Sequence, residues 1–246
     1  MTRGAKKFVY GLLYLCLFAL LGYWIFGGLF RSVPANPSTC TDCPPQNQIA
    51  PISLVGAVRF WKSGDMAHVT LLGQIKNPNA DYGVSKLPYT FTLYDKNGAV
   101  VGTVQGAESV FPGTTKYVFG IYDGSAYDVG RTARADLAFS NPQWVAAGQF
   151  IAPNIAVTAG PATTVSQHGI EVTGSVRNTS PLTSGTIKVI ALLGNKYGDP
   201  IAAGQTLLGG LRSLDRASFS IFFPADASLT ANANPSFTRV FVSVEE

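Results

Sequence analysis

The sequence predicts an all-β protein in which two tandem β-sandwich domains follow a single transmembrane α-helix. Of its 246 residues only 13% are charged, and it contains 26 Gly and 15 Pro, a composition typical of compact all-β domains. From residue 52 onward, short apolar runs alternate with turn signals, and no amphipathic helical segment separates them. This spacing favours antiparallel sandwiches. The length allows two domains of about 100 residues each, and the pattern of the first half recurs in the second.

Residues 8–30 form an apolar run without a charge, and a basic tail, residues 1–7, precedes it. As a helix, about 22 residues extend roughly 33 Å, which is enough to span a lipid bilayer. Three basic residues precede the run and one follows it, and residues 1–31 contain no acidic residue. The positive-inside rule therefore places the tail in the cytoplasm and residues 32–246 outside the cell membrane.

A cleaved signal peptide is the alternative interpretation of the same segment. Residues 33–35, Val-Pro-Ala, resemble a small-x-small cleavage site, so cleavage near Ala35 would release a secreted protein. The apolar run exceeds the core of about 7–15 residues that is usual for signal peptides. We therefore expect a signal anchor that stays in the bilayer.

Residues 31–51 form a Pro-rich linker that contains Cys40 and Cys43 as a Cys-x-x-Cys pair. Repeated Pro favours extended conformations, so we expect a semi-rigid spacer between the membrane and the first domain. The pair lacks the helix and βαβ context of a redox motif, and it supplies half of a tetrahedral metal site. A structural disulfide, within one chain or between two chains, is the prediction, and a redox or metal role is the alternative.

The clearest structural signal is a β-hairpin at residues 89–104. Tyr89, Phe91 and Leu93 fall on one side of a pleated strand over residues 89–94. The turn at residues 95–98, Asp-Lys-Asn-Gly, suits a hairpin because Asn and Gly tolerate positive φ. A shorter, Val-rich strand follows at residues 100–104.

Phe91, Leu93, Tyr94 and Asp95 spell the Phe-x-Leu-Tyr-Asp motif, and the stretch 55–140 resembles the FxLYD domain family. The Gly-Gln-Ile-Lys-Asn sequence at residues 73–77 is similar to a strand end of that family, and the Phe-Pro-Gly at 111–113 is similar to one of its loops. The resemblance implies a small immunoglobulin-like β-sandwich of the kind found in bacterial and archaeal envelope proteins.

The first immunoglobulin-like domain is expected to span residues 52–147. The apolar runs between its turn signals predict strands at residues 54–61, 68–76, 89–94, 100–104, 116–122 and 134–139.

The second domain, residues 148–246, repeats the first at an offset of about 100 residues. The corresponding pairs are 73–77 with 174–178, 95–98 with 195–198, and 117–119 with 219–221. Residues 155–246 resemble a degenerate second copy of the FxLYD domain. In this copy the sequence Ala-Leu-Leu-Gly-Asn at residues 191–195 stands where the Phe-x-Leu-Tyr-Asp motif is expected. An alternating run at residues 238–244 would close the second sandwich. The short joint at 147–154 predicts a restricted relative orientation of the two domains.

Charge and motif content favour a binding or structural role over catalysis. Of 18 Lys and Arg, four flank the apolar run, which leaves 14 against 14 Asp and Glu. This balance argues against nucleic acid as a partner. Phosphate loops, nucleophile elbows, zinc-protease motifs and calcium loops are absent from the sequence. We therefore predict a non-enzyme with no catalytic residue, no cofactor and no metal site.

Structural roles are predicted for the polar residues of the motif and for the two His. Tyr94 would pack on the sheet face, and Asp95 would accept backbone hydrogen bonds in its turn. His68 and His168 lie in corresponding regions of different copies, which argues against a shared site. Asn178 begins a formal Asn-Thr-Ser glycosylation sequon in an expected loop.

The sequence thus predicts a membrane-anchored extracytoplasmic protein that presents two immunoglobulin-like domains to other envelope or membrane proteins, or to further copies of itself. It would be a subunit or accessory of a prokaryotic cell-envelope assembly. The alternative is a ligand-binding or sensor module with a site at the interdomain joint, near Trp144, Phe150 and Tyr127. A third hypothesis is thiol activity at Cys40 and Cys43.

Overall fold

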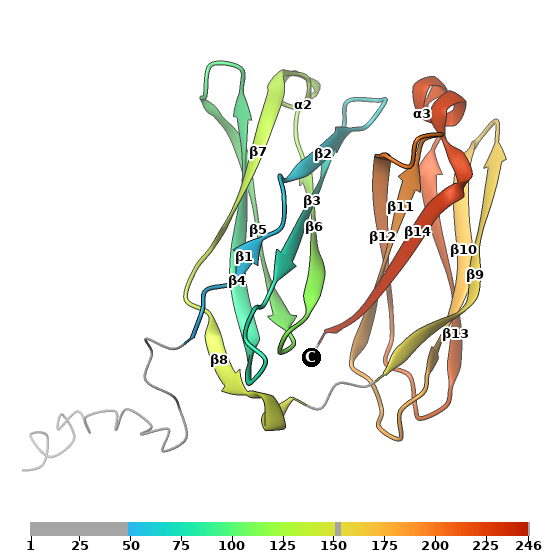
Figure 1. Cartoon of the computed structure of the whole chain (residues 1–246). Coiled ribbons are helices and arrows are strands. Elements are labelled where there is room, and N and C mark those ends of the chain that lie inside the picture. The colour runs from blue at the N-terminus through green and yellow to red at the C-terminus, as the bar shows by residue number, and fades with distance from the viewer. Residues whose placement is uncertain (1–48, 151–153, 246) are drawn as a thin grey trace, which may run out of the picture. The chain divides into compact units, whose positions relative to one another are not determined.

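The computed structural model describes residues 49–150 and 154–245 (Figure 1). All the described residues belong to one compact unit of the chain. Several predictions concern segments outside the described residues. These segments are the basic tail, the apolar run 8–30 and the pair Cys40 and Cys43. Within the two described stretches, no helix combines the length and the apolar character that crossing a bilayer requires.

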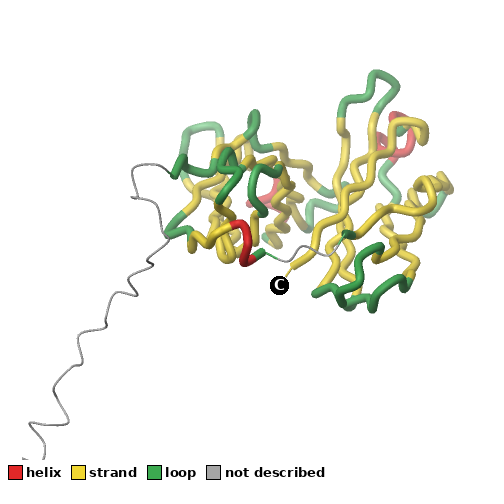
Figure 2. Tube along the Cα trace, turned by 60° about the horizontal axis from the view of Figure 1, so that its bottom comes forward, coloured by secondary structure: helices red, strands yellow, loops and turns green. Residues whose placement is uncertain are grey.

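The described chain is predominantly β, and the predicted all-β class is confirmed (Figures 1 and 2). The first eight strands are β1 (Ser53–Leu54), β2 (Arg59–Lys62), β3 (His68–Lys76), β4 (Tyr82–Asp95), β5 (Val100–Val110), β6 (Thr115–Asp123), β7 (Thr132–Phe139) and β8 (Gln143–Ala146). The strands that follow are β9 (Ile155–Ser166), β10 (Gly169–Asn178), β11 (Thr186–Gly194), β12 (Pro200–Leu208), β13 (Arg216–Pro224) and β14 (Asn234–Glu245).

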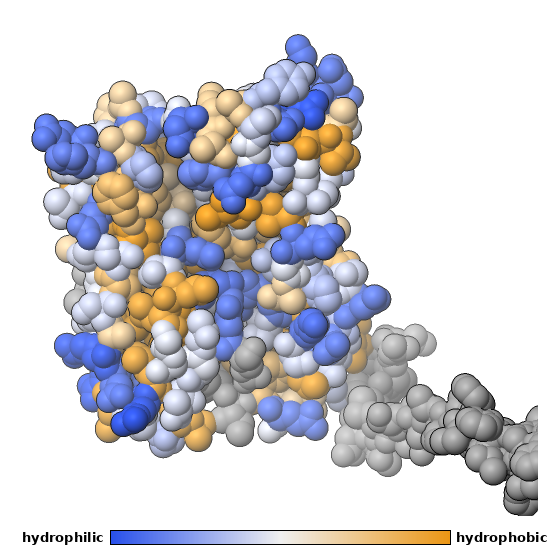
Figure 3. All heavy atoms as spheres, turned by 180° about the vertical axis from the view of Figure 1, so that it is seen from behind, coloured by the Kyte–Doolittle hydropathy of each residue, from blue (hydrophilic) through white to orange (hydrophobic). Residues whose placement is uncertain are grey.

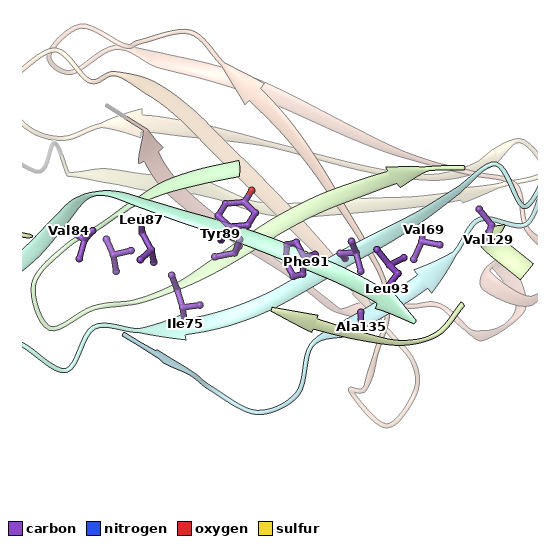
Figure 4. Close-up of a cluster of buried hydrophobic side chains, with 12 residues drawn as sticks. Val69, Ile75, Val84, Leu87, Tyr89, Phe91, Leu93, Val129 and Ala135 are labelled. Carbon is purple, nitrogen blue, oxygen red and sulfur yellow. The ribbon is translucent and has the colours of Figure 1, made fainter. Parts of the chain in front are cut away.

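Strands β1–β8 form the first sandwich. In one sheet β3 pairs with β1, β2 and β6, and in the other β4 pairs with β5, β7 and β8, all antiparallel. We name these the β3 sheet and the β4 sheet. The alternating apolar residues of the predicted hairpin point between them, as Figure 4 shows for Tyr89, Phe91 and Leu93. They form a buried core with Ile75 and other aliphatic side chains.

Strands β9–β14 form the second sandwich, with the same pairing order. The β10 sheet runs β9-β10-β13, as β2-β3-β6 does, and the β11 sheet runs β12-β11-β14, as β5-β4-β7 does. Short helices join equivalent strands, α2 (Ala126–Arg131) between β6 and β7 and α3 (Ala227–Asn232) between β13 and β14. A separate buried core fills this sandwich. The exact domain boundaries stay predictions.

The repeated sequence pattern corresponds to repeated local structure. Asn77, directly after β3, and Asn178, the last residue of β10, are fully buried, and each donates from Nδ2 to two backbone carbonyls. In the hairpin turns, Oδ1 of Asp95 and of Asn195 accepts from the backbone N–H two and four residues later. Gly98 and Gly198 then take φ of +82° and +85°, which an L side chain rarely adopts.

Several local features differ from the predictions: β4 begins earlier than expected, β5 ends later, and β8 was not predicted. The strand expected at 54–61 is broken between β1 and β2. The helices α2 and α3 were not predicted, and Ser125 and Asp226 cap them by accepting from the backbone N–H three residues later. The sequon residue Asn178 is buried and hydrogen-bonded rather than displayed on a loop.

Candidate functional site

The two sandwiches share a buried apolar contact. Side chains on the outward face of the β3 sheet meet side chains on the outward face of the β11 sheet, with Leu72 and Phe119 from the first and Ile190, Leu192 and Ala203 from the second. All five are buried. Strand β11 therefore has both faces covered, its own core on one side and the first sandwich on the other. Such a strand favours a continuous apolar run rather than an alternating one.

A buried charge cluster lies in the same contact. Lys188 of β11 pairs with Glu108 of β5 in the first sandwich and with Glu245 of β14. Lys116 of β6 approaches the second oxygen of Glu108 at 2.5 Å. Burial alone would lower the pKa of Lys188, but the adjoining Glu108 and Glu245 carboxylates outweigh it and hold that pKa above its ordinary value. The amine is thus a stable cation that ties the two sandwiches together.

Tyr89 extends this polar region on the side of the first sandwich. Its hydroxyl donates to the backbone oxygen of Phe119 at 3.2 Å. Burial raises the pKa of Tyr89 to about 12, and the Glu108 carboxylate adds to the increase. The phenol therefore stays neutral and serves as a hydrogen-bond donor at any physiological pH.

A groove of about 790 Å³ opens beside this contact, between the two sandwiches. The first sandwich contributes residues 60–65, 68, 70, 119 and 121. The second contributes residues 195, 201–206, 220–226, 228, 229 and 232. Walls from both sandwiches mean that the shape of the groove depends on the buried contact beneath it.

The outward face of the β3 sheet forms the floor of the groove. Thr70 of β3 lies opposite Trp61 of β2 and Ile121 of β6 in the strand pairing, so these side chains share one face. Ile121 is 45% exposed and lines the groove. The floor is therefore an apolar surface that a bound molecule could cover.

Two carboxylates lie at the end of the groove where the β2–β3 loop meets α3. A Cβ added at Gly64 would collide with the Asp226 carboxylate, so the loop and the start of α3 are in close approach. Hydrogen bonds from Ser63 and the Ala67 N–H lower the pKa of Asp65, and bonds from Ser228 and the Leu229 N–H lower that of Asp226. Both are anionic at neutral pH, and neither forms a salt bridge with another described residue.

Gln205 provides an unsatisfied polar atom in the groove wall. Its Oε1 is buried and has no hydrogen-bond partner in the described part of the chain. Gln205 pairs with Ile190 across the β11–β12 ladder, so its side chain lies on the face toward the first sandwich. A buried acceptor without a donor is unfavourable, and a bound donor would satisfy it.

The predicted family-motif residues do not lie at the groove. Phe91 and Leu93 are fully buried in the first core (Figure 4). Tyr94 lies under the Arg134 guanidinium, 4.5 Å from the ring centroid, and Asp95 stabilises its turn. These contacts give the motif a structural role. His68 lines the groove, whereas His168 is an exposed residue of the β9–β10 turn.

The residues predicted for a site at the interdomain joint do not line the groove either. Trp144 packs on the core of the first sandwich. Phe150 makes an edge contact with Phe111, with ring centroids 5.2 Å apart. Tyr127 is an exposed residue of α2. The groove lies between the sandwiches but not at the predicted joint site, and residues of β2, β3, β6, β12, β13, α3 and the β2–β3 loop line it.

Apolar side chains, amides, hydroxyls, two carboxylates, Lys62 and His68 line the groove. In residues 49–150 and 154–245, His, Cys, Asp and Glu form no group of three or more that could hold a metal ion. The arrangement offers apolar contact area and hydrogen bonds to a bound molecule.

No protein-family model and no curated protein matches this chain. Among solved structures, red sea bream transglutaminase is 12% identical with a TM-score of 0.26, covering 80% of this chain and 30% of that one. A Bacteroides uniformis β-glucuronidase is 15% identical with a TM-score of 0.25, covering 68% and 23%. The N-terminal CBM22 tandem domain of Paenibacillus barcinonensis Xyn10C is 12% identical with a TM-score of 0.18, covering 80% and 87%. The chain thus spans less than a third of the first two proteins, and similarity at this level carries no argument about function.

Proposed function

We propose that this chain is a non-enzymatic interaction protein, which presents two immunoglobulin-like sandwiches as one rigid pair and binds a partner protein in the groove between them. The observation that carries the proposal is that both sandwiches supply the groove walls, while the Lys188–Glu108 pair holds those walls together. A site whose walls are already fixed loses little conformational entropy when it binds.

The character of the surface supports a protein partner. Polar and apolar side chains are interspersed on the face that Figure 3 shows, which resembles the surfaces of non-obligate interfaces. Exposed apolar side chains such as Ile121 and Phe222 line the groove. Buried apolar anchors surrounded by polar groups are the usual source of binding energy at protein interfaces.

The proposed location is the outer side of a prokaryotic cell membrane. The apolar run 8–30 and its basic flank support an anchor with residues 32–246 outside. The resemblance of residues 55–140 to the FxLYD family supports an envelope setting. In this arrangement the anchor fixes the location and the Pro-rich linker sets the distance of the groove from the bilayer.

A second candidate function is recognition of a small molecule in the same groove. Its volume of about 790 Å³ favours this alternative, because small-molecule sites enclose about 300–1,000 Å³. A small ligand would occupy the groove without forming a complex of higher mass, so the size of the bound species separates the two candidates.

Photo-cross-linking in intact cells tests the proposed function. A photoreactive residue replaces Ile121 in the groove or, as a matched control, Val100, which is 55% exposed on β5 outside the groove. We expect a discrete protein adduct from position 121 that is missing from position 100. Adducts of equal yield at both positions, or adducts with small molecules alone, would contradict a protein partner in the groove.

The location is tested separately by chemical labelling. A Cys introduced at position 100 should react with a membrane-impermeant maleimide in intact spheroplasts. A residue that reacts only after lysis would place the sandwiches on the cytoplasmic side and overturn the proposed orientation.

A further inference from the structure

One edge of strand β12 pairs with no other described strand, and that edge faces the groove. Within the described residues β12 forms its ladder with β11 alone. Six consecutive residues, 201–206, line the groove, although alternate side chains of a strand point to opposite faces. A strand can line one groove continuously in this way when its edge, with the unpaired backbone groups, borders the groove.

We propose that the groove binds an extended segment of the partner protein as an added strand on the edge of β12. The inference rests on the proposed function and names the form in which the partner is recognised. In such strand addition, backbone hydrogen bonds give affinity and pockets for alternate side chains give specificity. The added strand extends the β11 sheet over the floor made by the β3 sheet.

The groove walls define what the segment contains. An added strand on β12 directs alternate side chains toward the floor residues Trp61 and Ile121, and the intervening ones toward the inner face of β13, which presents Ile221 and Phe223. Apolar residues therefore suit the floor-facing positions. Six residues of β12 extend roughly 20 Å, so about six residues of the partner pair with them.

Charge complementarity defines one end of the segment. Asp65 and Asp226 lie at the same end of the groove as anions without a salt-bridge partner in the described chain. A Lys or Arg at that end of the partner segment would form ion pairs with these carboxylates. The unpaired Oε1 of Gln205 accepts a hydrogen bond from a donor on the segment.

Selection from a displayed library of random ten-residue peptides tests the inference. The full-length chain in lipid nanodiscs is the bait, and the Ile121→Arg variant serves for counter-selection. We expect enriched peptides with alternating apolar residues and a terminal basic residue, which bind the parent chain at least tenfold more tightly than Ile121→Arg. The Val100→Arg variant, which places the same charge on another exposed strand residue, should bind like the parent.

Backbone N-methylation of the best synthetic peptide separates strand addition from other modes. On an added strand, alternate N–H groups face β12 and the intervening ones face away. N-methylation at one set of alternate positions should weaken binding about tenfold, and N-methylation at the other set should weaken it less than about threefold. Equal loss at both sets, or no selected peptide that depends on residue 121, would overturn strand addition.

The experiments distinguish failure of the strand-addition model from failure of the proposed interaction role. A protein adduct at position 121 that maps to a folded, non-extended surface of the partner would retain the interaction role and overturn strand addition. Absence of any position-specific protein adduct would contradict the interaction role itself.

Discussion

Lys188 of the second sandwich donates to the Glu108 carboxylate of the first, across a separation of 80 residues in the chain. The two side chains are only 8% and 1% exposed. Lys116 and Glu245 complete the cluster, which therefore joins two cations and two anions in a contact that is otherwise apolar. Sliding one sandwich over the other would separate buried charges. The cluster therefore opposes any change in the relative position of the two sandwiches.

Removal of the Lys188 amine should strongly destabilise the pair of sandwiches. Lys188→Met keeps the apolar stem but leaves the buried Glu108 without its cross-sandwich cation, and we expect a loss of about 3–5 kcal/mol in unfolding free energy. Urea unfolding measures it. The control Asp136→Asn breaks the exposed pair of Arg134 and Asp136, 62% and 53% exposed, and should lose less than about 1 kcal/mol. Equal losses would contradict a special role for the buried cluster.

Stability should fall at alkaline pH through Tyr89 and Lys188. Folding raises the pKa of both groups above the value in the unfolded chain, and it raises that of Tyr89 to about 12. Each therefore contributes stability that is fully present below its unfolded pKa, about 10 for both, and is lost as pH rises through the folded value. Urea unfolding between pH 8 and 11 should show the decline, and Tyr89→Phe should make it shallower. An unchanged slope in that variant would contradict the assignment.

Local patterns predicted local structure well. The apolar run predicted as a strand at residues 68–76 has the bounds of β3, and the Asp-Lys-Asn-Gly turn has Gly98 at positive φ. Both signals act within a few neighbouring residues, through side-chain alternation or steric freedom. The helices α2 and α3 escaped prediction because six residues are too few to establish a helical period.

The contact between the sandwiches could not be predicted from local alternation. At Thr90 and Thr92 the outward face of β4 is half-buried, whereas the equivalent Ile190 and Leu192 of β11 are covered by the first sandwich. This extra burial accounts for the apolar residues Ile190 and Leu192 at the positions where the first copy has Thr90 and Thr92. The signal was present in the unbroken apolar run 189–193, which indicates a strand with both faces buried, but its partner lies in a distant segment.

The groove was missed for a related reason. Its carboxylates, Asp65 and Asp226, come from a hairpin loop and a helix cap that are far apart in sequence. Each residue has an ordinary local function, in a turn or at a helix N-terminus. Only the packing of the two sandwiches places them at one end of a shared surface.

Asn77 in the first sandwich and Asn178 in the second should contribute equally to the stability of the chain. Asn77→Ala leaves the carbonyl oxygens of Tyr82 and Phe111 without their Nδ2 donor, and Asn178→Ala does the same at its own two carbonyls. We expect a loss of about 1–3 kcal/mol in unfolding free energy for each substitution. The exposed turn residue Asn97 is the control, and Asn97→Ala should change stability by less than about 0.5 kcal/mol. A loss confined to one sandwich would contradict their equivalence.

Gln205 and Gln105 form a matched pair for testing the groove. They occupy equivalent positions, opposite Ile190 on β12 and opposite Thr90 on β5, but Gln205 lines the groove while Gln105 is exposed. Gln205→Leu removes a buried, unpaired acceptor, so the free chain should keep or gain stability in urea unfolding. The same substitution should weaken binding of the selected peptide about three- to tenfold, because the peptide loses an acceptor. Gln105→Leu should leave the affinity unchanged, and equal affinity losses in both variants would show that the Gln205 carbonyl does not contact the peptide.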